Sequence, residues 1–260
     1  MPTLDHAAIR RLPGPFVPFV AAVLVLAAAA GCATQPAEDA ATAAARYRVV
    51  IASPIRTDQD RRTDAARRPA EFLPFTQVKP GMQAMDISAG GGYTTQLLAL
   101  AVGPTGKVWA QTPQPSVALN KRLADQPQAN ITVVARPFDD PVPAEAPKLD
   151  LITIVLNYHD ITYLPVDRAQ MDRRLYAALK PGGRLVVVDH SAVADADIGV
   201  GKSLHRIDEA IVRNELKQAG FVLDAEGDYL RNPADPRTDT SNPPRTSPTD
   251  KFVLRFVRPM

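Results

Sequence analysis

Two groups of residues in this chain could do chemistry. The first is the glycine-rich stretch at 86–93 (DISAGGGY), and the second is the set of histidines His159, His190 and His205. Glycines between a strand and a helix let the backbone approach a ligand closely, and the helix N-terminus favours negative charge. Histidines titrate near neutral pH, which suits them to proton transfer or metal ligation. Together these residues predict a small-ligand site.

The elements that must position these residues alternate between strand and helix from about residue 47 to the end of the chain. This alternation predicts one α/β domain with a parallel sheet. The run at 149–156 (LDLITIVL) is almost continuously apolar, as expected for a central strand covered on both faces. The other expected strands are 82–87, 107–111, 131–135, 184–188, 221–229 and 251–257.

The three histidines are expected on one rim of this sheet. His159 comes just after the fourth strand, His190 just after the fifth, and His205 just before the helix at 207–219. In open α/β sheets, ligands bind at the carboxyl ends of the strands near the point where the strand order reverses. The sequence therefore predicts that the histidines and the glycine-rich turn share one ligand-binding edge.

The glycine-rich turn does not match the dinucleotide fingerprint G-x-G-x-x-G, because Thr95 stands where its third glycine would be. The stretch instead resembles D-x-G-x-G-x-G, the first motif of class I S-adenosylmethionine-dependent methyltransferases, with Ser88 in place of the first glycine. The segments at 78–82 (VKPGM) and 179–185 (LKPGGRL) resemble other turns of that family. The resemblance implies a Rossmann-like, seven-stranded, mostly parallel sheet whose last strand is antiparallel.

In more detail, the chain is similar to a group of exported methyltransferases. The shared segments are Asn157–Asp160 after the fourth strand, Asp189-His190 after the fifth and His205–Asp208 before the next helix. The resemblance implies that S-adenosylmethionine is the cofactor and that a small molecule accepts the methyl group. The cofactor-binding residues that it implies are Asp86, Ser88, Ala89, Gly90, Gly91, Gly92, Tyr93, Thr112, Phe138, Asp139 and Asn157.

A general base with a pKa near 7 could remove the proton of the methyl acceptor, and histidine suits this role. His159, oriented by Asp160, is the first candidate; His190 is the second, and His205 is a candidate for substrate binding. An alternative is a divalent metal held by His159, His190 and His205, which we favour less. Another alternative is a ligand-binding protein of the same fold without turnover.

The N-terminal segment resembles a bacterial lipoprotein signal. Arg10 and Arg11 precede an uncharged apolar run at 16–30, and Cys32 follows. We expect a signal peptide at 1–31, lipid on Cys32, an alanine-rich tether at 32–46 and the folded domain at 47–260. The resemblance implies an exported, membrane-anchored protein that faces the periplasm or the cell exterior.

Composition excludes several other classes of protein. The single cysteine excludes an intramolecular disulfide framework and a cysteine-based metal site. The formal net charge of +2 gives no footprint for nucleic acid. The 25 prolines are about twice the usual share, and five of them fall in the long connection at 230–250, which we expect to be functional or mobile. The sequence carries no signal for an oligomeric state.

Overall fold

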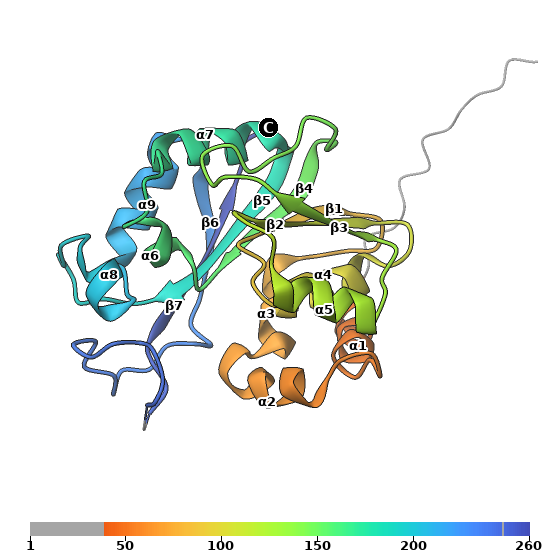
Figure 1. Cartoon of the computed structure of the whole chain (residues 1–260), viewed down its shortest axis with the longest axis horizontal. Coiled ribbons are helices and arrows are strands. Elements are labelled where there is room, and N and C mark those ends of the chain that lie inside the picture. Colours follow the sequence, from red (N-terminus) through yellow and green to blue (C-terminus); the bar gives the residue numbers. More distant parts are fainter. Residues whose placement is uncertain (1–38, 246) are drawn as a thin grey trace, which may run out of the picture. The chain divides into compact units, whose positions relative to one another are not determined.

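The computed structural model describes residues 39–245 and 247–260, and within them a seven-stranded sheet organises the fold (Figure 1). The strand order is β3-β2-β1-β4-β5-β7-β6. The first five strands pair in parallel, and β7 runs antiparallel to both of its neighbours. This confirms the predicted mostly parallel sheet with an antiparallel last strand. The strands are β1 (Gln83–Ile87), β2 (Lys107–Thr112), β3 (Ile131–Ala135), β4 (Leu149–Val155), β5 (Leu179–His190), β6 (Val222–Gly227) and β7 (Lys251–Val257).

Helices cover both faces of the sheet, because the central strands are apolar on both sides. Along β5, Leu185 and Val187 join one buried cluster while Val186 and Val188 join the other. The helices are α1 (Ala40–Ile51), α2 (Asp58–Arg67), α3 (Pro69–Thr76), α4 (Tyr93–Val102), α5 (Val117–Asp125), α6 (Tyr158–Ile161), α7 (Arg168–Ala178), α8 (Val200–Leu204) and α9 (Glu209–Gln218).

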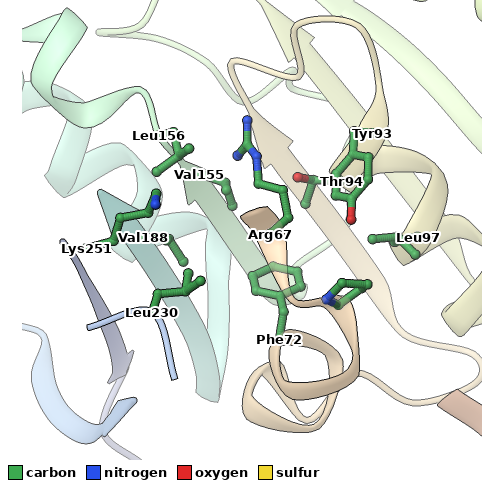
Figure 2. A pocket seen from close by; sticks show the side chains of 11 residues that line it. Arg67, Phe72, Tyr93, Thr94, Leu97, Val155, Leu156, Val188, Leu230 and Lys251 are labelled. Atoms are coloured by element: carbon green, nitrogen blue, oxygen red, sulfur yellow. The ribbon is translucent and has the colours of Figure 1, made fainter. Parts of the chain in front are cut away.

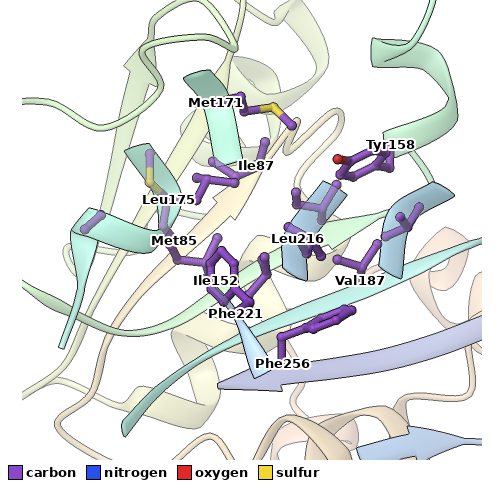
Figure 3. Close-up of a cluster of buried hydrophobic side chains, with 14 of the residues drawn as sticks. Met85, Ile87, Ile152, Tyr158, Met171, Leu175, Val187, Leu216, Phe221 and Phe256 are labelled. Carbon is purple, nitrogen blue, oxygen red and sulfur yellow. The ribbon is translucent and has the colours of Figure 1, made fainter. Parts of the chain in front are cut away.

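The larger cluster lies under α7 and α9. Figure 3 shows Leu175 of α7 and Leu216 of α9 facing Ile152 of the sheet, and all three side chains are fully buried. Burying a side chain of this size contributes about 2 kcal/mol of transfer free energy, so this face holds the two helices on the sheet. The smaller cluster joins α1, α3 and α4 to the opposite face.

The first helix begins earlier than the sequence indicates. Asp39 caps α1 by accepting a hydrogen bond from the Thr42 backbone N–H at 2.7 Å, and Tyr47 and Val50 are buried against the domain. Residues 40–46 are therefore helical and belong to α1, whereas we expected them in the tether. The expected signal peptide and Cys32 lie outside the described residues. No helix in the part of the chain that the structure describes is long and apolar enough to cross a bilayer.

The described part of the connection at 230–250 is held by a buried ion pair. Arg206 is fully buried and donates to Asp235 at 2.8 and 3.1 Å and to the backbone carbonyls of Ser191 and Asp239 at 2.8 and 2.7 Å. Asp235 also accepts from the backbone N–H of Asp250 at 2.7 Å, just before β7. The connection is thus fastened to the end of β5 rather than free of the domain.

Replacement of Asp235 by alanine should leave the Arg206 charge buried without its carboxylate. Losing one partner of a buried pair costs about 3–5 kcal/mol, so the midpoint of urea unfolding should fall and residues 230–250 should lose hydrogen-exchange protection. Asp239→Ala is the control, because that side chain is exposed and only its backbone carbonyl contacts Arg206. Equal stability of the two variants would contradict this account.

Candidate active site

The turn between β1 and α4 has a left-handed backbone at every second residue. The φ angle is +56° at Ser88, +55° at Gly90 and +82° at Gly92. This conformation is unfavourable for residues with a Cβ, so the left-handed backbone explains why the motif has glycines at these positions. Ser88 is held there by its backbone N–H, which donates to Gln111 Oε1 at 2.9 Å, and by its hydroxyl, which donates to Asn157 Oδ1 at 2.8 Å.

Asp86, near the end of β1, is a buried carboxylate with no ion-pair partner among the described residues. The hydroxyls of Thr95 and Thr153 donate to its two oxygens at 2.7 and 2.8 Å. Burial raises the pKa of Asp86 to about 6, although the two hydroxyl donors and the charge of Arg67 partly oppose the shift. This carboxyl group therefore has unused capacity to accept hydrogen bonds from a cationic ligand group.

A cavity of about 240 Å³ lies beside the turn. A Cβ on Gly90 would enter open space, with the Ser88 carbonyl oxygen nearest at 3.9 Å. A Cβ on Gly92 would come within 2.7 Å of the Leu119 side chain, so Gly92 lets α5 pack closely instead of facing the cavity. The predicted cofactor residues that line the cavity are Asp86, Ser88, Ala89, Gly90, Gly91, Tyr93 and Asn157.

One guanidinium group joins α2 and α5 to the turn. Arg122 of α5 donates from Nε to the Gly91 carbonyl oxygen at 2.6 Å, and its two terminal nitrogens donate to the Asp60 carboxylate at 2.9 and 2.7 Å. Asp60 belongs to the capping box at the start of α2. The cavity wall therefore depends on a bidentate ion pair between two helices.

Four predicted cofactor residues do not line this cavity: Gly92, described above, and Phe138, Asp139 and Thr112. Phe138 is 5 % exposed and packs in the larger core cluster, so it offers no face for stacking on a ligand. Asp139 accepts a hydrogen bond from the Gln170 side chain through its backbone oxygen. Thr112 is buried, and its hydroxyl has no hydrogen-bond partner in the described part of the chain. The adjacent Gln111 side chain is engaged by Ser88 and by the Arg136 carbonyl oxygen.

His159 lies between two carboxylates. Its Nδ1 is 2.6 Å from Asp189 Oδ1 and its Nε2 is 3.1 Å from Asp160 Oδ1. Burial alone would lower the pKa of His159, but the two carboxylates and their hydrogen bonds raise it to about 9. His159 is therefore an imidazolium near pH 7, with both ring nitrogens donating. A protonated ring has no lone pair with which to accept a proton, which argues against the expected role as general base.

His190 has the opposite character. Its Nδ1 is 2.8 Å from the Thr249 hydroxyl oxygen. Burial and the neighbouring positive charges of Lys251 and His159 lower the pKa of His190 to about 2. This ring is therefore neutral near pH 7. Because Nδ1 is taken up by Thr249, Nε2 is the nitrogen left for a ligand among the residues that the structure describes.

His205 completes the cluster through Asp160. The His205 Nδ1 and the Tyr163 hydroxyl lie 2.9 and 2.8 Å from Asp160 Oδ1, the same oxygen that faces His159. The ring centroid of His159 lies 5.8 Å from that of His190 and 5.6 Å from that of His205. The three histidines therefore lie together at one edge of the sheet, as predicted. Ligand atoms of His159, Asp160 and His205 come within 4.8 Å of one another, but His190 is not part of that group. Hydrogen bonds of Asp160 with the rings of His159 and His205 and with the Tyr163 hydroxyl account for these contacts without a metal.

A second and larger cavity, of about 620 Å³, opens beside His190. It lies between the C-terminal end of α2, the end of β5 and residues of the 229–249 segment. Arg67, the last residue of α2, lines this cavity and also the one beside the glycine turn. Figure 2 shows Arg67 near the middle of the side chains that line a third, mostly apolar pocket, with Lys251 to one side of it. From the sequence alone, Arg67 is interpreted as part of a solvated helix face, and nothing singles out Lys251.

A family model described as the ubiE/COQ5 methyltransferase family matches residues 70–201, which is half of the chain. The chain belongs to the ubiE/COQ5 methyltransferase family. A ubiquinone/menaquinone biosynthesis C-methyltransferase of Burkholderia multivorans is 32% identical over 118 residues, covering 45% of this chain and 46% of that protein. Its counterpart in Cupriavidus metallidurans is 29% identical over 116 residues, with the same coverage. The chain thus matches about half the length of these relatives.

Solved structures show the same fold. A S-adenosylmethionine-dependent methyltransferase from Aquifex aeolicus superimposes with a TM-score of 0.54 at 18% identity, covering 77% of this chain and 98% of that one. The N-methyltransferase NodS from Bradyrhizobium japonicum gives a TM-score of 0.54 at 14% identity, covering 78% and 98%. At these identities the likeness concerns the fold alone.

S-adenosylmethionine is the cofactor of the ubiE/COQ5 family, and the residues of this chain fit it. Gly90 leaves open space beside the turn that a Cβ would enter, and the buried carboxyl of Asp86 forms no ion pair within the part of the chain that the structure describes. An ammonium group of a ligand would complement that carboxyl. At the end of β2, the Gln111 side chain is already hydrogen-bonded to Ser88 and to the Arg136 carbonyl oxygen. The hydroxyl of the next residue, Thr112, has no hydrogen-bond partner in the described part of the chain.

The two buried histidines should titrate in opposite directions from a normal imidazole. In NMR spectra of ring-labelled histidine, His159 should stay protonated up to about pH 8 and His190 should stay neutral down to about pH 4. His159→Gln and His190→Gln assign the signals. A His159 ring that loses its proton near pH 6 would contradict the ion-pair account.

Proposed function

We propose that this chain is an S-adenosylmethionine-dependent methyltransferase whose acceptor binds in the 620 Å³ cavity. The observation that carries the proposal is the shared wall of the two cavities. Arg67 lines both, so a ligand beside the glycine turn and a ligand beside His190 would be neighbours. Family membership supports the reaction class, and the strand order supports a site at the carboxyl ends of β1 and β4.

When bound, S-adenosylmethionine supplies a methyl group that is activated by a positively charged sulfur. The chain contributes orientation: the turn at Gly90 and Gly91 would surround the methionine part, while Asp86 and Asn157 would receive its polar groups. Tyr93 closes the wall and is itself fixed, because its hydroxyl donates to Asp64 of α2 at 2.6 Å. Holding two reactants in line supplies much of the rate in such a transfer.

The histidines then have different roles. We propose that the neutral His190 accepts a hydrogen bond from the nucleophilic group of the acceptor, through Nε2. The charged His159 is a positioning residue: it neutralises Asp189 and orients Asp160, and it does not take the acceptor proton. His205 contacts Asp160 and is thereby one step removed from the acceptor cavity.

Cofactor binding is tested by calorimetry with S-adenosylmethionine and its demethylated product. Gly90→Asp should weaken binding about 100-fold or more, since it places a carboxylate in the open space beside the turn. Gly81→Asp is the matched control: its φ is also left-handed (+81°), and its Cβ would only touch the Thr105 hydroxyl at 3.6 Å. An absence of binding to the wild-type protein would refute the proposed function.

We also propose that the chain is exported and anchored by lipid on Cys32, facing the periplasm or the cell exterior. The support is the sequence: a basic start, an apolar run at 16–30 and a cysteine two positions after it. Cys32→Ser should move the protein from the membrane fraction to the soluble fraction, whereas a conservative Ser53→Ala change in the folded domain should not. Equal membrane association of Cys32→Ser would contradict lipid attachment.

A further inference from the structure

The acceptor cavity is positively charged. Five basic residues line it, and no aspartate or glutamate is among its lining residues in the described part of the chain. The five are Arg67, Arg68, Arg231, Arg245 and Lys251. A concave wall with charges of one sign concentrates ligands of the opposite sign.

Three of these charges are matched by carboxylates behind the wall. Arg68 pairs with Glu71. Arg231 pairs with Glu209 at 2.5 Å, and Arg245 approaches Asp235 at 3.5 Å. These arginines therefore have structural partners and need no ligand to balance them.

Arg67 and Lys251 form no ion pair with a carboxylate in the described part of the chain. The Arg67 guanidinium faces the ring of Tyr93, whose centroid is 6.0 Å away, and the more distant charges of Asp86 and Asp189 favour its charged form. The Lys251 ammonium group donates to the backbone carbonyl of Thr249 at 3.1 Å and forms no ion pair with a described carboxylate. Lys251 is nevertheless only 6 % exposed.

Burial disfavours the charge on both residues. Burial, and then the charge of Arg67, lower the pKa of Lys251 to about 8, although Asp235 and Asp250 act in the opposite direction. Burial also lowers the pKa of Arg67, against the effect of Asp86 and Asp189. Figure 2 shows the apolar walls that cause this desolvation, including Leu156 and Leu230. Two desolvated cations without an ion-pair partner among the described residues cost free energy that a bound anion would recover.

We propose that the methyl acceptor is an organic anion whose anionic group is held between Arg67 and Lys251. This inference rests on the proposed function, because it assigns the acceptor of that reaction. The anion would neutralise both cations, and its body would extend into the 620 Å³ cavity beside the neutral His190. The relatives named for ubiquinone/menaquinone biosynthesis are C-methyltransferases. The basic lining of this cavity favours an acceptor that carries a negative charge over an uncharged quinone ring.

The test compares an anion with its neutral isostere. Benzoate and benzamide have the same shape, so NMR titration of the wild-type protein at pH 7 should show tighter binding of benzoate by about tenfold or more. In a second titration, inorganic phosphate is added to the protein with benzoate already bound. Competition between the two distinguishes a phosphate site from a carboxylate site. A wild-type protein that binds benzoate no better than benzamide, and that inorganic phosphate does not perturb, overturns the proposal.

Two variants locate the site. Lys251→Met and Arg67→Met keep much of the apolar stem of the side chain and remove its charge, and each should reduce anion affinity about tenfold without changing benzamide binding. Arg62→Met is the control, because Arg62 is exposed on α2 and contacts Gln59. Since Lys251→Met removes an unmatched buried charge, we expect it to unfold at or above the wild-type temperature. An anion preference that survives in both variants overturns the proposal.

The same proteins separate this inference from the proposed function. Lys251 does not line the cavity beside the glycine turn, so Lys251→Met should bind S-adenosylmethionine with wild-type affinity. If the wild-type protein binds the cofactor but shows no anion preference, the inference fails alone. If it prefers anions but does not bind the cofactor, the anion site stands and the methyltransferase proposal fails.

Discussion

The rim of the sheet depends on one buried carboxylate, Asp189 at the end of β5. It receives the backbone N–H of His159 at 2.9 Å, the ring of His159 at 2.6 Å and the backbone N–H of His190 at 2.7 Å. These bonds tie the segment after β4 to β5 and keep the His159 ring charged. That charge in turn holds the pKa of Asp160 well below its usual range, against the effect of burial, and helps to keep His190 neutral. The protonation pattern of the whole cluster thus follows from satisfying one fully buried group.

The two cavities meet where the strand order reverses. β1 and β4 are adjacent in the sheet but far apart in sequence, and the chain leaves them toward opposite sides. Asp86 near the end of β1 and Asn157 just beyond β4 therefore face the same space. Topology alone creates this hollow, and the left-handed turn at Gly90 keeps it open by removing a side chain.

Local sequence patterns predicted much of the fold and of the glycine turn. The apolar runs predicted the strands. The spacing of Ser88, Gly90 and Gly92 predicted the turn because each of these positions has a left-handed backbone. The cofactor contact predicted for Phe138 does not agree with its place in the core. An aromatic residue after a strand has the same sequence pattern whether it packs in the core or faces a ligand. Roles that depend on partners from elsewhere in the fold could not be predicted. Asp189 and Asp160 raise the pKa of His159, which makes the predicted base a cation. Lys251 forms no ion pair with a described carboxylate, which only the folded chain can show.

Helix α2 links the two ligand spaces mechanically. Asp60, in its first turn, holds Arg122 and hence the Gly91 carbonyl, while Arg67 at its end faces the acceptor cavity. The two residues are seven positions apart, or about 10 Å along a rigid helix. A cofactor that settles the glycine turn therefore also settles the Arg67 backbone. Binding of either ligand would therefore help to order the wall that the other contacts, and by linkage the coupling would be equal in both directions.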